Sequence, residues 1–414
     1  MAEAVFKIQD GRRVLIPPAC GFPMAFAQEL AQQSARFRNL TVMGGILIPK
    51  APFVSEEFKG HFHFVSYHTG GFVREALARK QASYVPLRYF DTIAAFSPGG
   101  PLAADVVVVH VAPPDPQGRY SLGVSVSYPL PVARRAPLVI AQLNPQMPRT
   151  LGNSFLLEDE IDILVEADEP VVAYEAQRAG KVEEQIARHV ADLVPDGATL
   201  QTGIGAVPEA LLGFLKGKKD LRLYSLLVDS ALELYEAGSV REGPEGSRIC
   251  EIMGSQKLFR FAHENPDVFM EDSTVIHDPR KICQIPRFVS VLSALEVDLT
   301  GQVAAESLGP KMVAGIGGQL DFAMGTSLAE DSVCIVAIPS RGGKDGGQSR
   351  IVEKLQAGAA VTTPRSLVRF VASEYGVADL WGKDLDQRAR ALVKIAAPEF
   401  REGLEKAWQE RGRS

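Results

Sequence analysis

Glycine-containing turns and one acidic segment carry the residue types that could bind an anionic or carbonyl ligand and present a carboxylate to it. The first turn, Gly203-Ile204-Gly205-Ala206-Val207-Pro208, follows an apolar stretch and precedes a predicted helix. Small residues let a carbonyl or an anion approach the backbone, and the first N–H groups of a helix donate hydrogen bonds to it. A plain strand-to-helix turn is the alternative. Pro208 stands where a dinucleotide-binding motif has its third glycine, which disfavours a nicotinamide dehydrogenase.

The second turn region combines two glycine-rich runs that are separated by one apolar stretch. The runs are Gly315-Ile316-Gly317-Gly318-Gln319-Leu320-Asp321-Phe322 and Pro339-Ser340-Arg341-Gly342-Gly343-Lys344-Asp345-Gly346-Gly347. They predict a backbone-lined channel in which Arg341 and Lys344 are available for phosphate groups. A pair of surface turns is the alternative, but the density of glycines favours ligand binding.

The acidic segment is Ser373-Glu374-Tyr375-Gly376 at the end of an apolar stretch. A carboxylate two residues before a glycine is sterically suited to enter a cleft. Most glutamates simply face water, so Glu374 becomes informative only together with other motifs.

The elements that must position these residues are short apolar runs alternating with segments of helical period. Continuous hydrophobicity indicates strands that are buried on both faces, as in a parallel sheet covered by helices, so the predicted class is α/β. The expected strands are 40–48, 105–111, 138–144, 161–167, 198–204, 221–228 and 331–338. A helix predicted over 180–194 suggests two domains, 1–180 and 181–414, the second carrying most of the ligand-binding motifs.

The two halves open with a similar pattern. Residues 8–30 and 194–215 each contain an Asp-Gly turn, an apolar strand, a glycine-containing turn ending in proline, and a helix that begins with that proline. We therefore expect a duplicated strand-turn-helix unit, although unrelated α/β units also resemble one another by chance.

Composition limits the function classes. The chain has 414 residues with 44 Lys plus Arg against 50 Asp plus Glu, a net charge of −6, so no global positive field would attract nucleic acid or anionic lipid. The four cysteines lie far apart without metal-ligand spacing, which predicts reduced thiols. No apolar run is long enough to span a membrane, and a cytoplasmic protein is expected.

Several long motifs in one order resemble the acetyl-CoA hydrolase/transferase family, which includes 4-hydroxybutyrate and butyryl-CoA:acetate CoA-transferases. The similarity covers nearly the whole chain. The motifs are IAQLN followed by MPRTLG at 140–152, GIGAVP at 203–208, ALEVDLTGQV at 294–303, GIGGQLDF at 315–322, PSRGGKDG at 339–346 and EYGVADLWG at 374–382.

The resemblance implies two similar α/β domains with the active site between them, coenzyme A as part of the acyl-CoA substrate, no metal, and a homo-oligomer. It places Gly203, Ile204, Gly205, Ala206, Val207, Gly317, Gly318, Gln319 and Lys344 at the coenzyme A. Gly70 and Gly71 become candidate oxyanion donors, although a helix cap by Thr69 explains that turn equally well. In such enzymes a glutamate attacks the acyl-CoA, and an anhydride and then a glutamyl-CoA thioester form before a second carboxylic acid resolves them.

This sequence departs from the family at the nucleophile. An ungapped alignment anchored on Asp229 and 236–238 puts Ser225 at the position of the family's glutamate. An asparagine of the family pattern is replaced by Leu292. Together with Tyr224, these changes predict a larger and less polar acyl pocket, which would suit an acyl chain bulkier than acetate.

Three outcomes follow from the missing glutamate. The first is hydrolysis of an acyl-CoA, with Glu374 as general base and backbone N–H groups stabilising the oxyanion. The second is CoA transfer to a carboxylic acid through Asp229, Glu374 or another carboxylate. The third is a CoA-binding protein without catalysis. Ser225 is a nucleophile only if a base such as His68 or His189 approaches it in three dimensions.

The pair His61 and His63 would lie on one face of a strand, a spacing that two metal ligands could use. No third ligand of a suitable type is nearby in the sequence, so a polar wall is the preferred interpretation and no metal is expected.

Overall fold

A computed structural model describes residues 1–411 and divides into two compact units. Unit 1 contains Met1–Glu175, Ser225–Asp229 and Glu242–Asp278, and unit 2 contains Ala176–Tyr224, Ser230–Arg241 and Pro279–Ser414. The chain therefore returns twice to unit 1 after leaving it. One strand, β12 (Arg222–Val228), changes unit between Tyr224 and Ser225.

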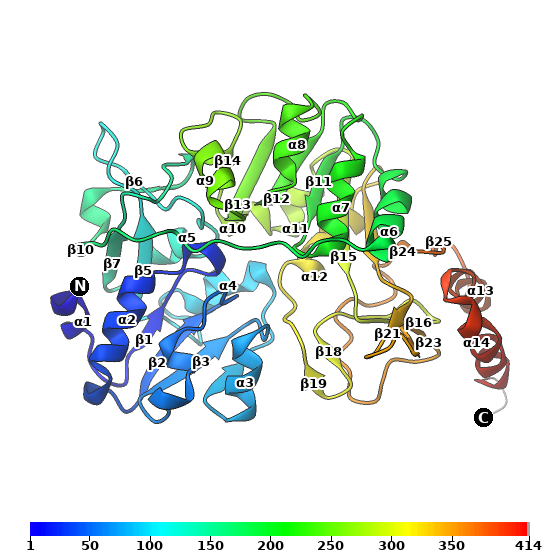
Figure 1. The fold of residues 1–414 in the computed structure, drawn as a ribbon, viewed down its shortest axis with the longest axis horizontal. Helices are drawn as coiled ribbons and strands as arrows, with labels where there is room; N and C mark the ends of the chain where they lie inside the picture. Colours follow the sequence, from blue (N-terminus) through cyan, green and yellow to red (C-terminus); the bar gives the residue numbers. More distant parts are fainter. Residues whose placement is uncertain (412–414) are drawn as a thin grey trace. The chain divides into compact units, whose positions relative to one another are not determined.

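Unit 1 is built on a seven-stranded sheet in the order β10-β7-β5-β1-β2-β3-β4, in which every pairing is parallel. Figure 1 shows this sheet with α1 and α2 beside it, in blue to teal. The strands are β1 (Arg13–Leu15), β2 (Leu40–Gly44), β3 (Phe62–Ser66), β4 (Ala82–Tyr84), β5 (Val106–Val111), β7 (Val139–Leu143) and β10 (Ile163–Glu166). The helices are α1 (Ala2–Phe6), α2 (Met24–Gln32), α3 (Phe72–Ala78), α4 (Tyr89–Phe96) and α5 (Pro129–Ala133).

Central strands of this sheet are mostly buried, because parallel sheets carry helices or loops on both faces. All six residues of β5 are buried, including His110. The edge strand β10 differs: its residues alternate between intermediate and exposed, and Leu164 is 43% exposed. The expectation that every predicted strand is buried on both faces is therefore wrong for β10, since an edge strand lacks a neighbour.

The segments that return to unit 1 contribute the end of β12, β13 (Ser247–Met253) and β14 (Phe269–Met270). These strands are neighbours in that order, and β8 (Leu151–Gly152), from the first segment of unit 1, pairs with β14. The returning segments also contain the helices α9 (Gln256–Ala262) and α10 (Ser273–Ile276). The short strands β6 (Tyr120–Ser121) and β9 (Phe155–Leu156) form an antiparallel pair.

Unit 2 has strands in the order β25-β24-β20-β15-β11, followed by the first residues of β12. All neighbours are parallel except β24 and β25, which form an antiparallel hairpin. The strands are β11 (Thr199–Thr202), β15 (Phe288–Ser293), β20 (Val333–Ala337), β24 (Phe370–Ser373) and β25 (Gly376–Asp379). The helices are α6 (Lys181–Ala191), α7 (Ala206–Phe214), α8 (Ala231–Glu236), α11 (Pro279–Ile282), α12 (Gln319–Ser327), α13 (Leu385–Ile395) and α14 (Pro398–Glu410).

Short strands outside the main sheet complete unit 2. The chain forms the sheet β17-β16-β23 and the pairs β18-β19 and β21-β22. Their bounds are β16 (Glu296–Asp298), β17 (Val303–Ala304), β18 (Ser307–Leu308), β19 (Lys311–Met312), β21 (Arg341–Gly342), β22 (Gln348–Ser349) and β23 (Ile351–Val352). The glycine-rich run at 341–347 therefore forms β21 and the turn at 343–347 that connects it to β22.

Both predicted strand-turn-helix openings exist, as β1-α2 and β11-α7, but they differ in detail. Pro23 immediately precedes α2 and is its N-cap residue. By contrast, α7 begins at Ala206, and Pro208 is already its third residue. The expectation that each helix begins with proline is therefore wrong for α7, where proline is tolerated because N–H groups in the first turn lack intrahelical partners.

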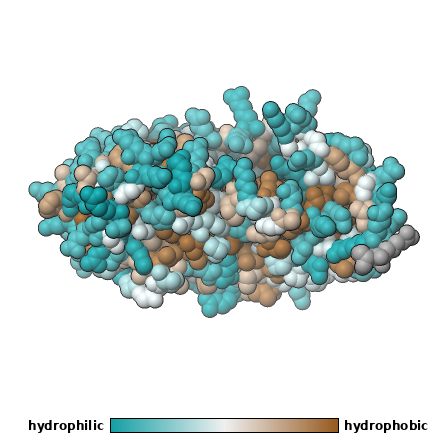
Figure 2. Space-filling model, turned by 90° about the horizontal axis from the view of Figure 1, so that it is seen from below, coloured by the Kyte–Doolittle hydropathy of each residue, from teal (hydrophilic) through white to brown (hydrophobic). Residues whose placement is uncertain are grey.

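The surface in Figure 2 mixes hydrophilic and hydrophobic residues, as expected for a chain with 46% hydrophobic residues and a small net charge. Across residues 1–411, helices that are long and apolar enough to cross a membrane are absent.

Candidate active site

Glu374 follows the last residue of β24, so the carboxyl end of a parallel strand presents its side chain. The backbone N–H of Ser340 donates to Oε2 at 2.9 Å, and the Ser340 hydroxyl donates to Oε1 at 2.5 Å. Arg341 approaches Oε1 at 3.5 Å, and the Glu374 side chain is 9% exposed. The carboxylate is therefore fixed in position and accessible on a small area.

Arg341 is committed to protein partners, which corrects its predicted availability for phosphate. Its Nε and Nη2 atoms donate to the carboxylate of Glu399 at 2.6 and 2.8 Å, and Nη1 donates to the Tyr375 hydroxyl at 2.6 Å. The Glu399 carboxylate and the Tyr375 hydroxyl raise the pKa of Arg341. Lys344 is exposed in the hairpin turn and is the cation of this motif that remains open to a ligand.

The turn at 203–206 connects β11 to α7 at the same edge of the unit 2 sheet as Glu374. A Cβ atom at Gly203 or Gly205 would meet nothing within 4 Å, and Gly205 has a φ of +126° where it caps α7. Ile204 and Ala206 are partly exposed, whereas Val207 is buried. This turn combines open space with helix N–H groups, as a ligand-binding turn requires.

The second glycine turn lies before α12. Gly317 has a φ of +55° and open space at its Cβ position, and Gly318 is the N-cap residue of the helix. The amide Nε2 of Gln319 donates to the Thr363 hydroxyl at 3.1 Å, so this side chain already has a protein partner. The backbone of the turn, more than the glutamine side chain, is open to a ligand.

Ser225 lies inside β12 with a φ of +77°, a conformation that residues with a Cβ atom rarely adopt. It is 7% exposed. Its hydroxyl lies 3.8 Å from the Cys250 sulfur, and that thiol donates to the Ser225 carbonyl oxygen at 3.2 Å. In the described chain the Ser225 hydroxyl has no hydrogen bond with a histidine or carboxylate, so a base that would activate it is missing.

Asp229 holds a helix start in unit 1. Both of its carboxylate oxygens accept hydrogen bonds from Ser255, one from the backbone N–H at 2.9 Å and one from the hydroxyl at 2.8 Å. Ser255 is the N-cap residue of α9. These contacts give Asp229 a structural role, whereas Glu374 lies in unit 2 beside the glycine turns.

Gly70 and Gly71 lie before α3 in unit 1. The N-cap residue of α3 is Gly71, with a φ of +55°, and not Thr69. The Gly70 N–H donates to Nδ1 of His68 at 3.1 Å. Burial lowers the pKa of His68 to about 4, which keeps its ring neutral and able to accept this bond. Gly70 N–H is therefore already engaged.

Tyr224 and Leu292 are buried in unit 2, on β12 and β15. The Tyr224 ring contacts Phe288 edge-on with a centroid distance of 5.1 Å and lies 6.4 Å from Phe322. Tyr224 thus belongs to an aromatic cluster of the core. Leu292 is the penultimate residue of β15, at the same sheet edge as the glycine turns.

A buried carboxyl group in unit 1 was not predicted from the sequence. Glu251 on β13 accepts hydrogen bonds at Oε1 from the hydroxyls of Ser125 (3.0 Å), Tyr89 (3.3 Å) and Ser127. Its Oε2 atom is buried without a partner in the described chain. Burial raises the pKa of Glu251 to about 8, so the group is protonated at neutral pH. A glutamate inside the apolar run 249–253 was the available sequence signal.

The predicted histidine pair does not form a metal site. His61 Nδ1 contacts the Phe37 carbonyl oxygen at 2.9 Å, and His63 Nε2 contacts the Ser83 hydroxyl at 2.8 Å. Within residues 1–411, His, Cys, Asp and Glu form no group of three or more with metal-binding geometry. All four cysteines are free, as predicted.

The chain has two α/β units with mostly parallel sheets. Glycine turns and a fixed carboxylate lie at the carboxyl ends of strands. Together these features define an enzyme of the CoA-transferase type. Family models agree: the acetyl-CoA hydrolase/transferase N-terminal domain matches residues 1–174, and the C-terminal domain matches residues 254–408. The chain belongs to the acetyl-CoA hydrolase/transferase family, and it is an acyl-CoA hydrolase or CoA-transferase.

Individual relatives cover nearly the whole chain. A 4-hydroxybutyrate coenzyme A transferase of Clostridium kluyveri is 39% identical over 99% of this chain and 96% of its own length. The crystal structure of RipA from Yersinia pestis has a TM-score of 0.92 and 28% identity, covering 99% of this chain and 96% of that one. A 4-hydroxybutyrate CoA-transferase structure from Porphyromonas gingivalis has a TM-score of 0.83, with 31% identity over 99% of this chain and 96% of that one.

Proposed function

We propose that this protein hydrolyses an acyl-CoA thioester, with Glu374 as the general base. The observation that carries the proposal is the absence of a free carboxylate on the described strand β12. The sequence alignment puts Ser225 at the position of the family nucleophile, and Asp229 is held by Ser255. Without a nucleophilic carboxylate there, the glutamyl-CoA route has no attacking group on this strand.

The proposed binding site for coenzyme A consists of the backbone turns 203–207 and 317–319 with Lys344. The turns offer open space at Gly203, Gly205 and Gly317, and N–H groups at the starts of α7 and α12. A lysine ammonium group suits a phosphate as a point charge. The thioester would then lie at the carboxyl edge of the unit 2 sheet, where parallel α/β sheets bind their ligands.

The chemical step uses a water molecule and Glu374. The carboxylate removes a proton from water as the water oxygen bonds to the thioester carbon, and the carbonyl oxygen becomes an oxyanion that backbone N–H groups stabilise. The C–S bond then breaks, and the products are a carboxylic acid and coenzyme A. A carboxylate has about four lone-pair sites. The Ser340 donors therefore fix Glu374 and still leave it capacity to accept a proton.

CoA transfer to a carboxylic acid is the second candidate, and the printed names of the relatives favour it. In that case Glu374 attacks the thioester, forms an anhydride and releases coenzyme A thiolate, which then attacks the glutamyl carbonyl and releases the acyl group as its acid. A second carboxylic acid then attacks the glutamyl-CoA thioester and forms a new anhydride with Glu374. The released coenzyme A thiolate attacks the acyl carbonyl of this anhydride, which frees Glu374 and gives the new acyl-CoA.

The distinguishing experiment measures free thiol and product thioester for a panel of acyl-CoAs, with and without acetate and longer acids. We expect thiol release that needs no acid acceptor. Glu374→Gln should lower it about 10²–10⁴-fold. Ser225→Glu restores a carboxylate at the aligned nucleophile position and should gain transfer that depends on an acid acceptor. Leu226→Glu, at the adjacent position, is the control and should not gain it. Acceptor-dependent transfer by the unmodified protein, without hydrolysis, contradicts hydrolysis and supports the second candidate.

We further propose that the enzyme acts in the cytoplasm as a homo-oligomer. Four free cysteines suit a reducing compartment. Analytical ultracentrifugation of the purified protein, and fractionation of the source cells, test these two points separately.

A further inference from the structure

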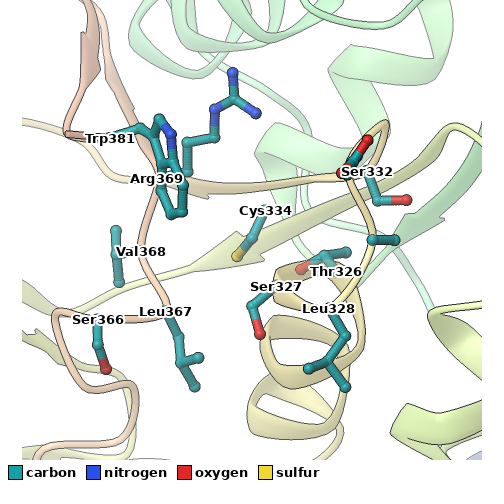
Figure 3. A pocket seen from close by; sticks show the side chains of 12 residues that line it. Thr326, Ser327, Leu328, Ser332, Cys334, Ser366, Leu367, Val368, Arg369 and Trp381 are labelled. Carbon is teal, nitrogen blue, oxygen red and sulfur yellow. The ribbon is translucent and has the colours of Figure 1, made fainter.

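Unit 2 contains a cavity of about 320 Å³ that the proposed reaction does not use. Its apolar lining comes from Leu328, Cys334, Leu367, Val368 and Trp381, and Arg369 adds a guanidinium group. Figure 3 shows Trp381 and Arg369 on one side, the end of α12 on the other, and Cys334 between them. This volume lies at the lower end of the range for small-molecule sites.

The cavity lies at the amino edge of the sheet. Cys334 is the second residue of β20, and Arg369 directly precedes β24. Because β24 and β20 are parallel, their amino ends lie together. Glu374 follows the opposite end of β24, five residues after Arg369, which corresponds to about 16 Å of extended chain. The cavity and the candidate active site are therefore separate places on one sheet.

Trp381 reaches this edge because β25 runs antiparallel to β24 and returns the chain to it. Asp379 is paired with Phe370, and the Leu380 N–H donates to the Arg369 carbonyl oxygen at 2.8 Å. The Trp381 side chain is nevertheless 71% exposed, and Leu328 across the cavity is 66% exposed. Two large apolar side chains facing solvent beside a concave surface are typical of a binding site.

Arg369 supplies the charge. Its guanidinium carbon lies 4.9 Å from the centroid of the Phe370 ring. In residues 1–411 no carboxylate is paired with the Arg369 side chain, and its Nε atom is buried without a hydrogen-bond acceptor. Its two Nη atoms also lack a protein acceptor within these residues but are not among the buried polar atoms, so they are open to a ligand carboxylate in the cavity.

The other polar groups limit the charge of the ligand. Ser327, Ser332 and Ser366 contribute hydroxyls, and Glu330 contributes an exposed carboxylate. Burial raises the pKa of Cys334 to about 12, so its thiol is neutral. One cation opposed by one exposed carboxylate favours a single negative charge over a dianion.

We propose that this cavity binds a small aromatic monocarboxylate, whose ring packs against Trp381 and Leu328 and whose carboxylate pairs with Arg369. Aromatic contacts prefer stacked or edge-to-face geometry, which an exposed indole permits. A guanidinium group binds a carboxylate through two parallel hydrogen bonds.

The test uses the intrinsic fluorescence of Trp381. The chain has two tryptophans, and Trp408 donates from Nε1 to Asp386 on the neighbouring helix. In a Trp408→Phe protein, Trp381 is the sole fluorophore. We expect saturable quenching by benzoate, about tenfold weaker quenching by phthalate, and none by benzamide. Saturating coenzyme A should leave the benzoate dissociation constant unchanged.

Arg369→Gln should weaken benzoate binding at least tenfold, and Arg369→Lys should restore part of it. Arg390→Gln is the matched control, because Arg390 is exposed on α13 and its loss changes the net charge equally. Circular dichroism checks that each variant is folded. Four results would each overturn the proposal. Two concern specificity: equal weakening of benzoate binding by both glutamine variants, or equal binding of benzoate and benzamide. The other two are quenching that never saturates and displacement of benzoate by coenzyme A.

Discussion

Ser340 holds the Glu374 carboxylate from two sides, with its backbone N–H on one oxygen and its hydroxyl on the other, at 2.9 and 2.5 Å. Ser340 follows β20 and Glu374 follows β24, which are neighbouring parallel strands. Because these strands are neighbours, the sheet brings Ser340 next to Glu374. Glu374 itself lies in the tight turn between β24 and β25, and the contact with Ser340 fixes its carboxylate. This contact positions the group that the proposed hydrolysis uses as its base.

Replacing Glu374 should remove activity without unfolding the protein. General-base catalysis is worth about 10²–10⁴-fold, so Glu374→Gln should lower kcat by that factor. Ser340→Ala should lower kcat less, because the backbone donor remains. Glu402→Gln, an exposed glutamate on α14, serves as the control and should keep full activity. A Glu374→Gln protein with near-normal kcat would remove Glu374 from the mechanism.

The backbone at Ser225 makes an unusual prediction about stability. A protein with alanine inside a strand is ordinarily more stable than the same protein with glycine there, by about 0.5–1 kcal/mol. At a φ of +77° a Cβ atom is strained, so Ser225→Gly should be at least as stable as Ser225→Ala. Urea denaturation of the two variants gives the comparison. An alanine variant that is clearly more stable than the glycine variant would show that this backbone is not strained.

Asp229 separates a structural role from a catalytic one. Asp229→Ala removes both acceptors of the partly buried Ser255, and each hydrogen bond contributes about 0.5–1.5 kcal/mol, so the free energy of unfolding should fall by about 1–3 kcal/mol. Activity per folded molecule should persist below the melting temperature. Loss of kcat in a fully folded Asp229→Asn protein would instead assign Asp229 to the chemistry.

Glu251 should make stability depend on pH. Its pKa is raised to about 8 in the folded protein, whereas an unfolded glutamate has a pKa of about 4.3. Between these values the folded state binds more protons than the unfolded state, so this group's contribution is complete below about pH 4 and declines until about pH 8. Glu251→Gln keeps an uncharged side chain and should flatten that decline.

The measurement is the urea midpoint of each protein from pH 5 to 9, and the informative quantity is the difference between wild type and Glu251→Gln. Taking this difference cancels the contributions of the other titrating groups. Glu57→Gln, an exposed glutamate in the same unit, should leave the profile unchanged. Parallel profiles for wild type and Glu251→Gln would mean that Glu251 titrates normally.

Acyl preference tests the replacement of a polar residue by Leu292. A larger apolar pocket predicts higher kcat/KM for medium-chain or branched acyl-CoAs than for acetyl-CoA, because each buried CH₂ contributes about 0.8 kcal/mol. Leu292→Asn should shift the preference toward acetyl-CoA. A wild-type preference for acetyl-CoA over every longer thioester is the contrary result.

The class of fold and most strands were predictable because buried parallel strands are continuous apolar runs. For example, the predicted 105–111 and 331–338 contain β5 and β20. Burial of β10 was overestimated because a run of residues does not reveal whether its strand has neighbours on both sides. The first predicted strand, 40–48, is shorter in the structure: β2 ends at Gly44, the first residue of a glycine pair.

Pairings across long stretches of sequence were not predictable. The Ser340 partner of Glu374, the Glu399 partner of Arg341 and the Ser255 partner of Asp229 depend on which strands and helices are neighbours in space. The same is true of the hydroxyls around Glu251, which come from α4 and the loop before α5. The return of Ser225–Asp229 to unit 1 also leaves no local pattern in the sequence.

Intact-protein mass spectrometry during turnover tests the central claim most directly. The protein is incubated with a good acyl-CoA and no acid acceptor, and thiol release is followed in the same sample. The proposed hydrolysis predicts continuous release of coenzyme A and free acid with an unmodified protein mass. A protein carrying covalently bound coenzyme A, with release that stalls until a carboxylic acid is added, would contradict it.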